Sequence, residues 1–153
     1  LFHANAGHVA FDLKDHSLML YHLNKSIQLN EQHNGGRGAA ISHTLLALYW
    51  ATEGEPGRAI DNLRKANHIC ATLNKKYWIG MLLYTKGIMR NIMDNRDEFK
   101  HLWIDELPES AVEYAKEAVC ILEGLHIEHE RQKACKLLTS LLSHEDISRY
   151  LTV

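Results

Sequence analysis

Residues 45–66 of the chain read LLALYWATEGEPGRAIDNLRKA, and this stretch decides the fold. Its middle, residues 53–57, combines two glycines with a proline, which are strong helix breakers. On both sides apolar residues recur every three or four positions, the spacing of an amphipathic helix. The pattern predicts helices over 39–52 and 58–73. Because the turn between them is short, we expect the two helices to form an antiparallel hairpin.

Small residues recur along the chain at a constant interval. Gly7, Ala47 and Gly87 occupy positions 7, 47 and 87, a spacing of 40 residues. Three more sets keep the same spacing, one at expected turns and two at expected core positions. They are Lys14, Gly54 and Asp94; Met19, Ala59 and Phe99; and Leu23, Leu63 and Trp103. The sequence therefore predicts tandem helical hairpins.

The repeat divides the chain, 1–153, into units of one domain. The expected units cover about 1–33, 38–74 and 76–125, with an insertion near 94–108 and capping helices over 127–152. The glycine-rich segment 34–38 is expected to break the chain between the first two units. A cap is expected because an end repeat has no neighbour to cover its apolar face. The further expected helices are 2–13, 17–30, 76–93, 97–104, one from 109, 128–143 and 145–150.

Composition narrows the class of protein. Hydrophobic residues make up 46% of the chain, charged residues 24%, and the formal charge is -2, which is typical of a soluble globular domain. Basic residues are not clustered, so no direct nucleic-acid contact is expected. The longest apolar run, 45–50, is too short to span a membrane. The chain begins without Met inside a helical pattern, so we expect it to be a piece of a longer protein.

The cysteines indicate a reducing compartment. Cys70, Cys120 and Cys135 are odd in number and widely spaced, which is neither a disulfide framework nor a metal motif. All three fall on apolar stripes of expected helices, where a free cysteine behaves as a small hydrophobic residue. We therefore expect buried thiols and a cytoplasmic location.

The second unit resembles one motif of the tetratricopeptide repeat (TPR) family. In that family a small residue at Ala47 lets the two helices approach, a large aromatic at Trp50 fills the gap, and Gly54 makes the turn. Ala59 and Ala66 match the two alanines that lie where helices cross. The spacing of 40 exceeds the roughly 34 residues usual in the family, and is similar to that of TPR-like sensor domains in bacterial signal-transduction regulators. The resemblance implies an all-α fold, a TPR-like superhelix (α-solenoid) of antiparallel hairpins.

The resemblance also implies a binding groove. In TPR domains the first helix of each pair lines the concave side, which here means 2–13, 39–52 and 76–93. Amide and apolar groups on such a surface suit a peptide, because amides bond its backbone and apolar pockets hold its side chains. The expected partner is a protein or peptide. The expected groove residues are Asn5, His8, Asp12, Thr44, Leu48, Thr52, Tyr84, Lys86, Ile88 and Asn91.

The sequence offers little for catalysis. Among eleven histidines, the closest pair of interest is His126 and His129, three residues apart, which one helix face could present together. Neither a HExxH motif nor a nearby cysteine completes a metal site, and a nucleophile elbow and a phosphate loop are both missing from the sequence.

No catalytic residue, metal or cofactor is predicted, so a metal-dependent enzyme is the least favoured of three functions. The favoured function is a non-catalytic binding scaffold, the regulatory or sensor module of a larger signalling or transcription-regulating protein; the other alternative is a homo-oligomerisation domain, such as a homodimer.

Overall fold

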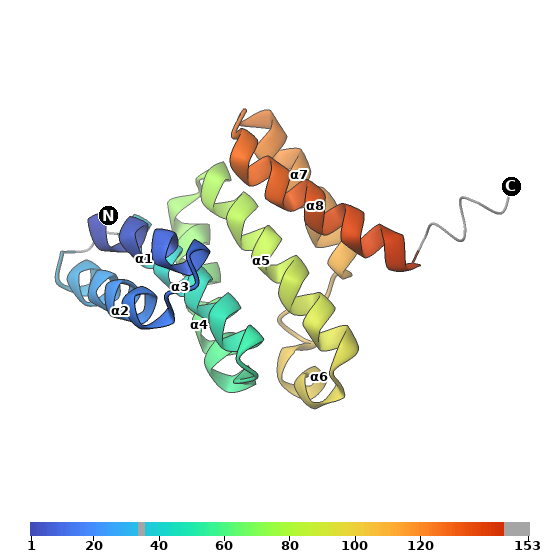
Figure 1. Ribbon diagram of the computed structural model, residues 1–153, viewed down its shortest axis with the longest axis horizontal. Helices are drawn as coiled ribbons and strands as arrows, with labels where there is room; N and C mark the ends of the chain where they lie inside the picture. The colour runs from blue at the N-terminus through green and yellow to red at the C-terminus, as the bar shows by residue number, and fades with distance from the viewer. Residues whose placement is uncertain (34–35, 146–153) are drawn as a thin grey trace, which may run out of the picture.

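The computed structural model describes residues 1–33 and 36–145, and these ranges hold eight α-helices and no strand (Figure 1). The prediction of an all-α protein is confirmed. The described helices include none with both the length and the apolar character needed to cross a bilayer. The helices are α1 (Phe2–Asp12), α2 (His16–His33), α3 (Gly36–Thr52), α4 (Pro56–Leu73), α5 (Lys76–Asn95), α6 (Asp97–Trp103), α7 (Ala111–Gly124) and α8 (Glu128–Glu145).

Helices that follow one another pack as pairs. α1 packs on α2, α3 on α4, and α7 on α8, while α5 takes α7 as its main partner. α5 lies between the first four helices and the last two (Figure 1). The short helix α6, expected over 97–104, fills the connection from α5 to α7 and contacts both α4 and α5.

The start of α3 corrects the expected break at 34–38. The helix begins at Gly36, three residues before the predicted position. Gly38 is buried where α3 meets α2, and a Cβ there would lie 2.6 Å from Nδ2 of Asn30 and 3.0 Å from Oγ of Ser26. This glycine therefore permits a close helix contact instead of ending a helix. Residues 34–35 lie outside the described ranges. So does the part of the predicted helix 145–150 that follows Glu145, the last residue of α8.

Three connections use the same left-handed turn. The turn residues are Lys14, Gly54 and His126, with φ of 60°, 79° and 57°. After each, the next amide donates to a carbonyl five residues back: Asp15 to Ala10, Glu55 to Trp50, and Ile127 to Leu122. This is the Schellman arrangement that ends many helices. Asp94, expected to form the third turn of the 40-residue series, lies instead inside α5, which continues to Asn95.

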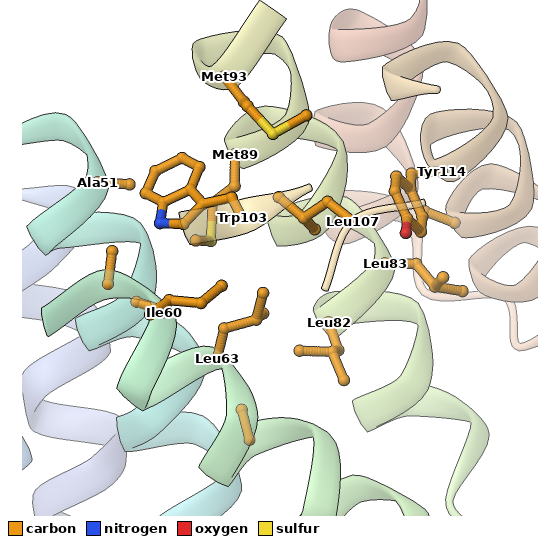
Figure 2. Packing of buried hydrophobic residues seen from close by; sticks show 14 of the residues in the cluster. Ala51, Ile60, Leu63, Leu82, Leu83, Met89, Met93, Trp103, Leu107 and Tyr114 are labelled. Carbon is orange, nitrogen blue, oxygen red and sulfur yellow. The ribbon is translucent and has the colours of Figure 1, made fainter. Parts of the chain in front are cut away.

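The core sits where α3, α4, α5, α6 and α7 meet. Leu23, Leu63 and Trp103, one of the sets spaced by 40 residues, are all fully buried. Leu63 and Trp103 belong to this main cluster, whereas Leu23 belongs to a second cluster between α1, α2 and α3. Figure 2 shows Trp103 in the main cluster with Ala51 and Met89. The indole Nε1 of Trp103 donates to the carbonyl oxygen of Pro56 at 3.0 Å, which ties α6 to the start of α4. The buried indole thus keeps a hydrogen bond, as a core tryptophan needs.

The cysteine prediction is correct in one place. Cys70 is buried, Cys135 is half-buried, and Cys120 is exposed. Cys120 follows Val119 on α7, whose buried face is carried by Ala115, Ala118 and Leu122. Cys120 therefore lies beside the buried face of α7 and not on it, and the prediction that this thiol is buried was wrong.

Candidate functional site

A partly open hollow is lined by residues of α1, α3, α4, α5 and α8, and we call it the central pocket. Its volume is about 150 Å³. A cavity of roughly that size holds a benzene molecule, so the central pocket has room for one ring-sized group. Its lining residues are His8, Phe11, Asp12, Ala40, Ile41, Thr44, Leu45, Leu48, Cys70, Tyr77, Trp78, Met81, Tyr84, Thr85 and Lys133.

Aromatic side chains form much of the pocket wall. Phe11 comes from α1, and Tyr77, Trp78 and Tyr84 come from α5. The rings of Tyr77 and Trp78 meet edge to face with centroids 4.5 Å apart. Such rings give a ligand large apolar contact areas and faces that attract cations.

One end of the central pocket carries charge. Nζ of Lys133 lies 3.5 Å from Oδ1 of Asp12 and 3.9 Å from Oε2 of Glu130. Nε2 of His8 lies 4.0 Å from the other oxygen of Asp12. Two carboxylates thus lie near one lysine, so the negative charges of Asp12 and Glu130 outnumber the positive charge of Lys133, although Glu130 is not itself part of the lining.

Glu130 is unusual for a carboxylate because it is almost completely buried. The residue is 7% exposed, and within residues 1–33 and 36–145 its Oε2 has no hydrogen-bond donor. Burial raises the pKa of Tyr77 and of Tyr84, and the negative charge of Glu130 acts on both in the same direction. The Glu130 charge therefore reaches the aromatic wall of the pocket.

Half of the predicted groove residues come together at this pocket. His8 and Asp12 line it from α1, Thr44 and Leu48 from α3, and Tyr84 from α5. Thr44 is buried, and its hydroxyl donates to the carbonyl of Ala40 at 2.7 Å, which leaves the oxygen as an acceptor toward the pocket. We predicted an exposed position for this side chain, and the structure places it on the pocket wall.

The other predicted residues lie elsewhere. Thr52 and Asn91 border a separate hollow of about 350 Å³ beside Arg96. Asn5 is exposed on α1, and Ile88 is half-buried on α5. Nζ of Lys86 lies 5.9 Å from the ring centroid of Tyr114 on α7, so this side chain packs away from the central pocket. Burial lowers the pKa of Lys86.

Several pocket residues were missed by sequence reasoning. Tyr77 and Met81 lie seven and three residues before Tyr84 on α5, so extending the predicted face of that helix by two turns would have found them. Lys133 had no such signal. It joins the site because α8 packs on α7 and α5, from where the long side chain reaches a residue 121 positions earlier in the chain.

The structure accounts for two groups that invited a catalytic interpretation. His126 is exposed in the left-handed turn between α7 and α8. Within the described residues, His, Cys, Asp and Glu side chains do not gather in any group of three that could hold a metal. Cys70 lines the central pocket, but burial raises the pKa of its thiol to about 11, so it stays protonated and weakly nucleophilic near neutral pH.

No protein-family model matches the chain, and comparisons with curated proteins and with solved structures find no match. The geometry of the central pocket is therefore the feature that supports a function for this chain.

Proposed function

We propose that the chain is a non-catalytic scaffold that binds a protein or peptide segment at the central pocket. One observation carries this proposal: α1, α3 and α5 jointly line a partly open hollow that is mostly apolar and has charged groups at one end. Ligand sites commonly combine apolar walls with a few convergent polar groups. A hollow of about 150 Å³ suits a single side chain of a partner better than a whole cofactor.

A TPR-like superhelix is part of the same proposal. Its support is that the first helices of successive pairs, α1 and α3, contact each other, and that α3 contacts α5 in turn. The same left-handed turn at Lys14 and Gly54, 40 positions apart, also supports a repeated unit. In such an array the central pocket belongs to the concave side, which is where partners of solenoid proteins bind.

Selection of peptides tests this function. A phage-displayed library of random peptides is panned on the immobilised chain, and each enriched peptide is then measured by fluorescence anisotropy. Met81→Trp is the matched variant, because the larger ring fills the pocket from a half-buried wall position. Leu102→Trp is the control, since Leu102 is 38% exposed on α6 and lies outside the pocket lining.

We expect enriched peptides to lose at least about tenfold in affinity for Met81→Trp, the loss that follows when a buried anchor is excluded. Binding to Leu102→Trp is expected to match the unchanged chain. Circular dichroism establishes that both variants keep their helices. Failure to enrich any peptide, or equal binding by the two variants, would contradict the proposal.

Self-association is a second candidate, favoured by an exposed apolar surface on α1 and α2. Phe2 and Leu13 are each 74% exposed, and Val9 and Tyr21 are each 59% exposed. Most of the exposed large hydrophobic residues of the described chain fall within 1–21. Exposed apolar side chains that gather on one part of a chain often mark a protein interface.

Sedimentation velocity at several concentrations tests the second candidate. A dimer that dissociates in the double variant Phe2→Ser, Leu13→Ser would support it. Ile104→Ser is the control, since Ile104 is 46% exposed on a different part of the chain. A strict monomer at every concentration would remove this candidate. A role as the sensor module of a regulator, and a cytoplasmic location, stay predictions that the full-length gene would test.

A further inference from the structure

We propose that the central pocket selects a cationic group on an apolar stem, and that the occupant is an arginine side chain of the bound peptide. The inference rests on the proposed function, because it names the part of the peptide that enters the pocket. Three features carry it: the net charge at one end, the aromatic wall, and the hydrogen-bonding character of the groups that face the ligand.

The charge at the pocket end favours a cation. Asp12 and Glu130 both lie within 4.0 Å of the single ammonium of Lys133. One lysine neutralises one carboxylate, so the second remains uncompensated. A carboxylate buried as deeply as Glu130 interacts strongly with nearby charge, because little solvent screens it. Asp12 lines the pocket, and the charge of Glu130 acts from beside Lys133 without being part of the lining.

The walls suit the stem and the planar head of arginine. A guanidinium stacks on aromatic faces more readily than a lysine ammonium does, and its flat shape matches a carboxylate. Tyr77, Trp78 and Tyr84 supply the rings, and Met81 and Leu48 supply aliphatic contact for the methylene groups. A volume of about 150 Å³ accommodates one such side chain and excludes a folded partner.

Acceptors and donors both line the pocket: Asp12 and Thr44 offer oxygens, Lys133 and Trp78 offer N–H groups, and Glu130 lies outside the lining. Carboxylate oxygens of Asp12 and Glu130 accept hydrogen bonds, and Oε2 of Glu130 is buried without a donor among the described residues. The Thr44 hydroxyl already donates a hydrogen bond to the carbonyl oxygen of Ala40 in its own helix. The oxygens of Asp12 and Thr44 at the lining can accept hydrogen bonds from a ligand with N–H groups, and a guanidinium has five of them.

Three small probes of one shape test the inference on the full chain. Benzamidine is a cation, benzamide is neutral and benzoate is an anion, and each has one ring. Titrations are followed by the indole N–H signal of Trp78 in ¹H–¹⁵N spectra, at a pH of about 8, where ordinary histidines are neutral. We expect benzamidine to bind with a Kd on the order of 1 mM, as its few atoms allow. Its affinity is expected to exceed that of benzamide by about fivefold, the ratio one partly solvated ion pair supplies, with benzoate the weakest.

Isosteric variants identify the source of the selectivity. Glu130→Gln and Asp12→Asn are each expected to reduce the preference for benzamidine over benzamide. Glu123→Gln removes an exposed carboxylate on α7 and is expected to leave the preference unchanged. A preference that survives in Glu130→Gln and Asp12→Asn alike would overturn the inference, and so would equal binding of the three probes or no shift of the Trp78 signal.

The inference and the proposed function can fail separately. If peptides bind at the pocket but benzamidine shows no preference, the charge selection is wrong and the scaffold stands. If benzamidine binds as expected but no peptide is enriched, the pocket recognises a cationic small molecule, and the peptide-binding function and the arginine occupant are both wrong.

Discussion

Nζ of Lys133 on α8 lies 3.5 Å from Oδ1 of Asp12 on α1, across 121 positions of sequence. This contact lies at one end of the central pocket and contributes to the charge there. Because the side chains are 26% and 46% exposed, the pair is worth less than about 1 kcal/mol of stability. Its main effect is on the electrostatics of the site.

Removal of the lysine charge should strengthen binding of a cation. In Lys133→Met both carboxylates lose their partner, so we expect benzamidine to bind about two to five times more tightly. We also expect stability to fall, because the buried Glu130 loses the ammonium beside it. Lys136→Met, an exposed lysine on the same helix, is the control. Weaker binding by Lys133→Met would show that the lysine itself contacts the ligand and would contradict the charge argument.

The shared turn at positions 14 and 54 predicts opposite effects of two substitutions. Lys14 adopts φ of 60°, a left-handed conformation that glycine tolerates best. Lys14→Gly should therefore raise the free energy of unfolding by up to about 1 kcal/mol. Gly54→Ala, at φ of 79°, should lower it by about 1 kcal/mol, and Gly54→Val by more. Urea denaturation of the variants measures both changes, and a stabilising Gly54→Ala would contradict the turn assignment.

Close packing of α1 on α2 depends on Gly7. A Cβ at this position would lie 2.8 Å from Cγ and 3.3 Å from the backbone nitrogen of Leu23, which is fully buried. Since neither atom can move freely, Gly7→Ala should destabilise the fold by about 1–3 kcal/mol.

Gly57 provides the matched control for that substitution. Nothing lies within 4 Å of a Cβ built there, and the residue is inside the first turn of α4. Gly57→Ala should be neutral or stabilising by about 0.5–1 kcal/mol, because alanine favours a helix. Thermal melts of the two variants give the comparison, and an equal loss in both would argue against the small-residue contact.

Stability should fall in mild acid because of His43. The residue is 7% exposed, and its Nδ1 lies 2.8 Å from Oδ1 of Asn62. Burial lowers the pKa of His43 below its ordinary 6.5, against an opposing effect of the Asn62 hydrogen bond; Lys65 lowers it further and Glu31 raises it.

A lowered pKa in the folded state means that the unfolded chain takes up this proton first. The contribution of His43 to stability is therefore fully present above about pH 6.5 and is lost as the pH falls toward the folded-state pKa. The slope is at most about 1.4 kcal/mol per pH unit for one proton. His43→Gln should reduce this slope in urea titrations between about pH 7.5 and 5.5. An unchanged slope would assign the acid sensitivity to other groups.

Local pattern was sufficient for much of the fold. Helical spacing of apolar residues marked the helices, and the 40-residue interval identified Leu23, Leu63 and Trp103 as core positions. Part of the central pocket could also be predicted from the sequence, because His8, Thr44 and Tyr84 lie on helix faces that an array of hairpins would bring together.

The rest depended on contacts that no local pattern encodes. Lys133 reaches the pocket because α8 packs on α7 and α5, and its long side chain extends from there to Asp12. Gly38 looked like a breaker, and its role became evident only where α3 meets α2. Cys120 lies one residue off the buried stripe of α7, a rotation too small to judge before the partner helix is known.

The position of an enriched peptide in a co-crystal with the chain tests the central claim most directly. We predict one peptide side chain inside the central pocket, in contact with Trp78 and Tyr84 and with its cationic end toward Asp12 and Glu130. A peptide bound on another surface, with nothing from it between α1, α3, α5 and α8, would contradict the account.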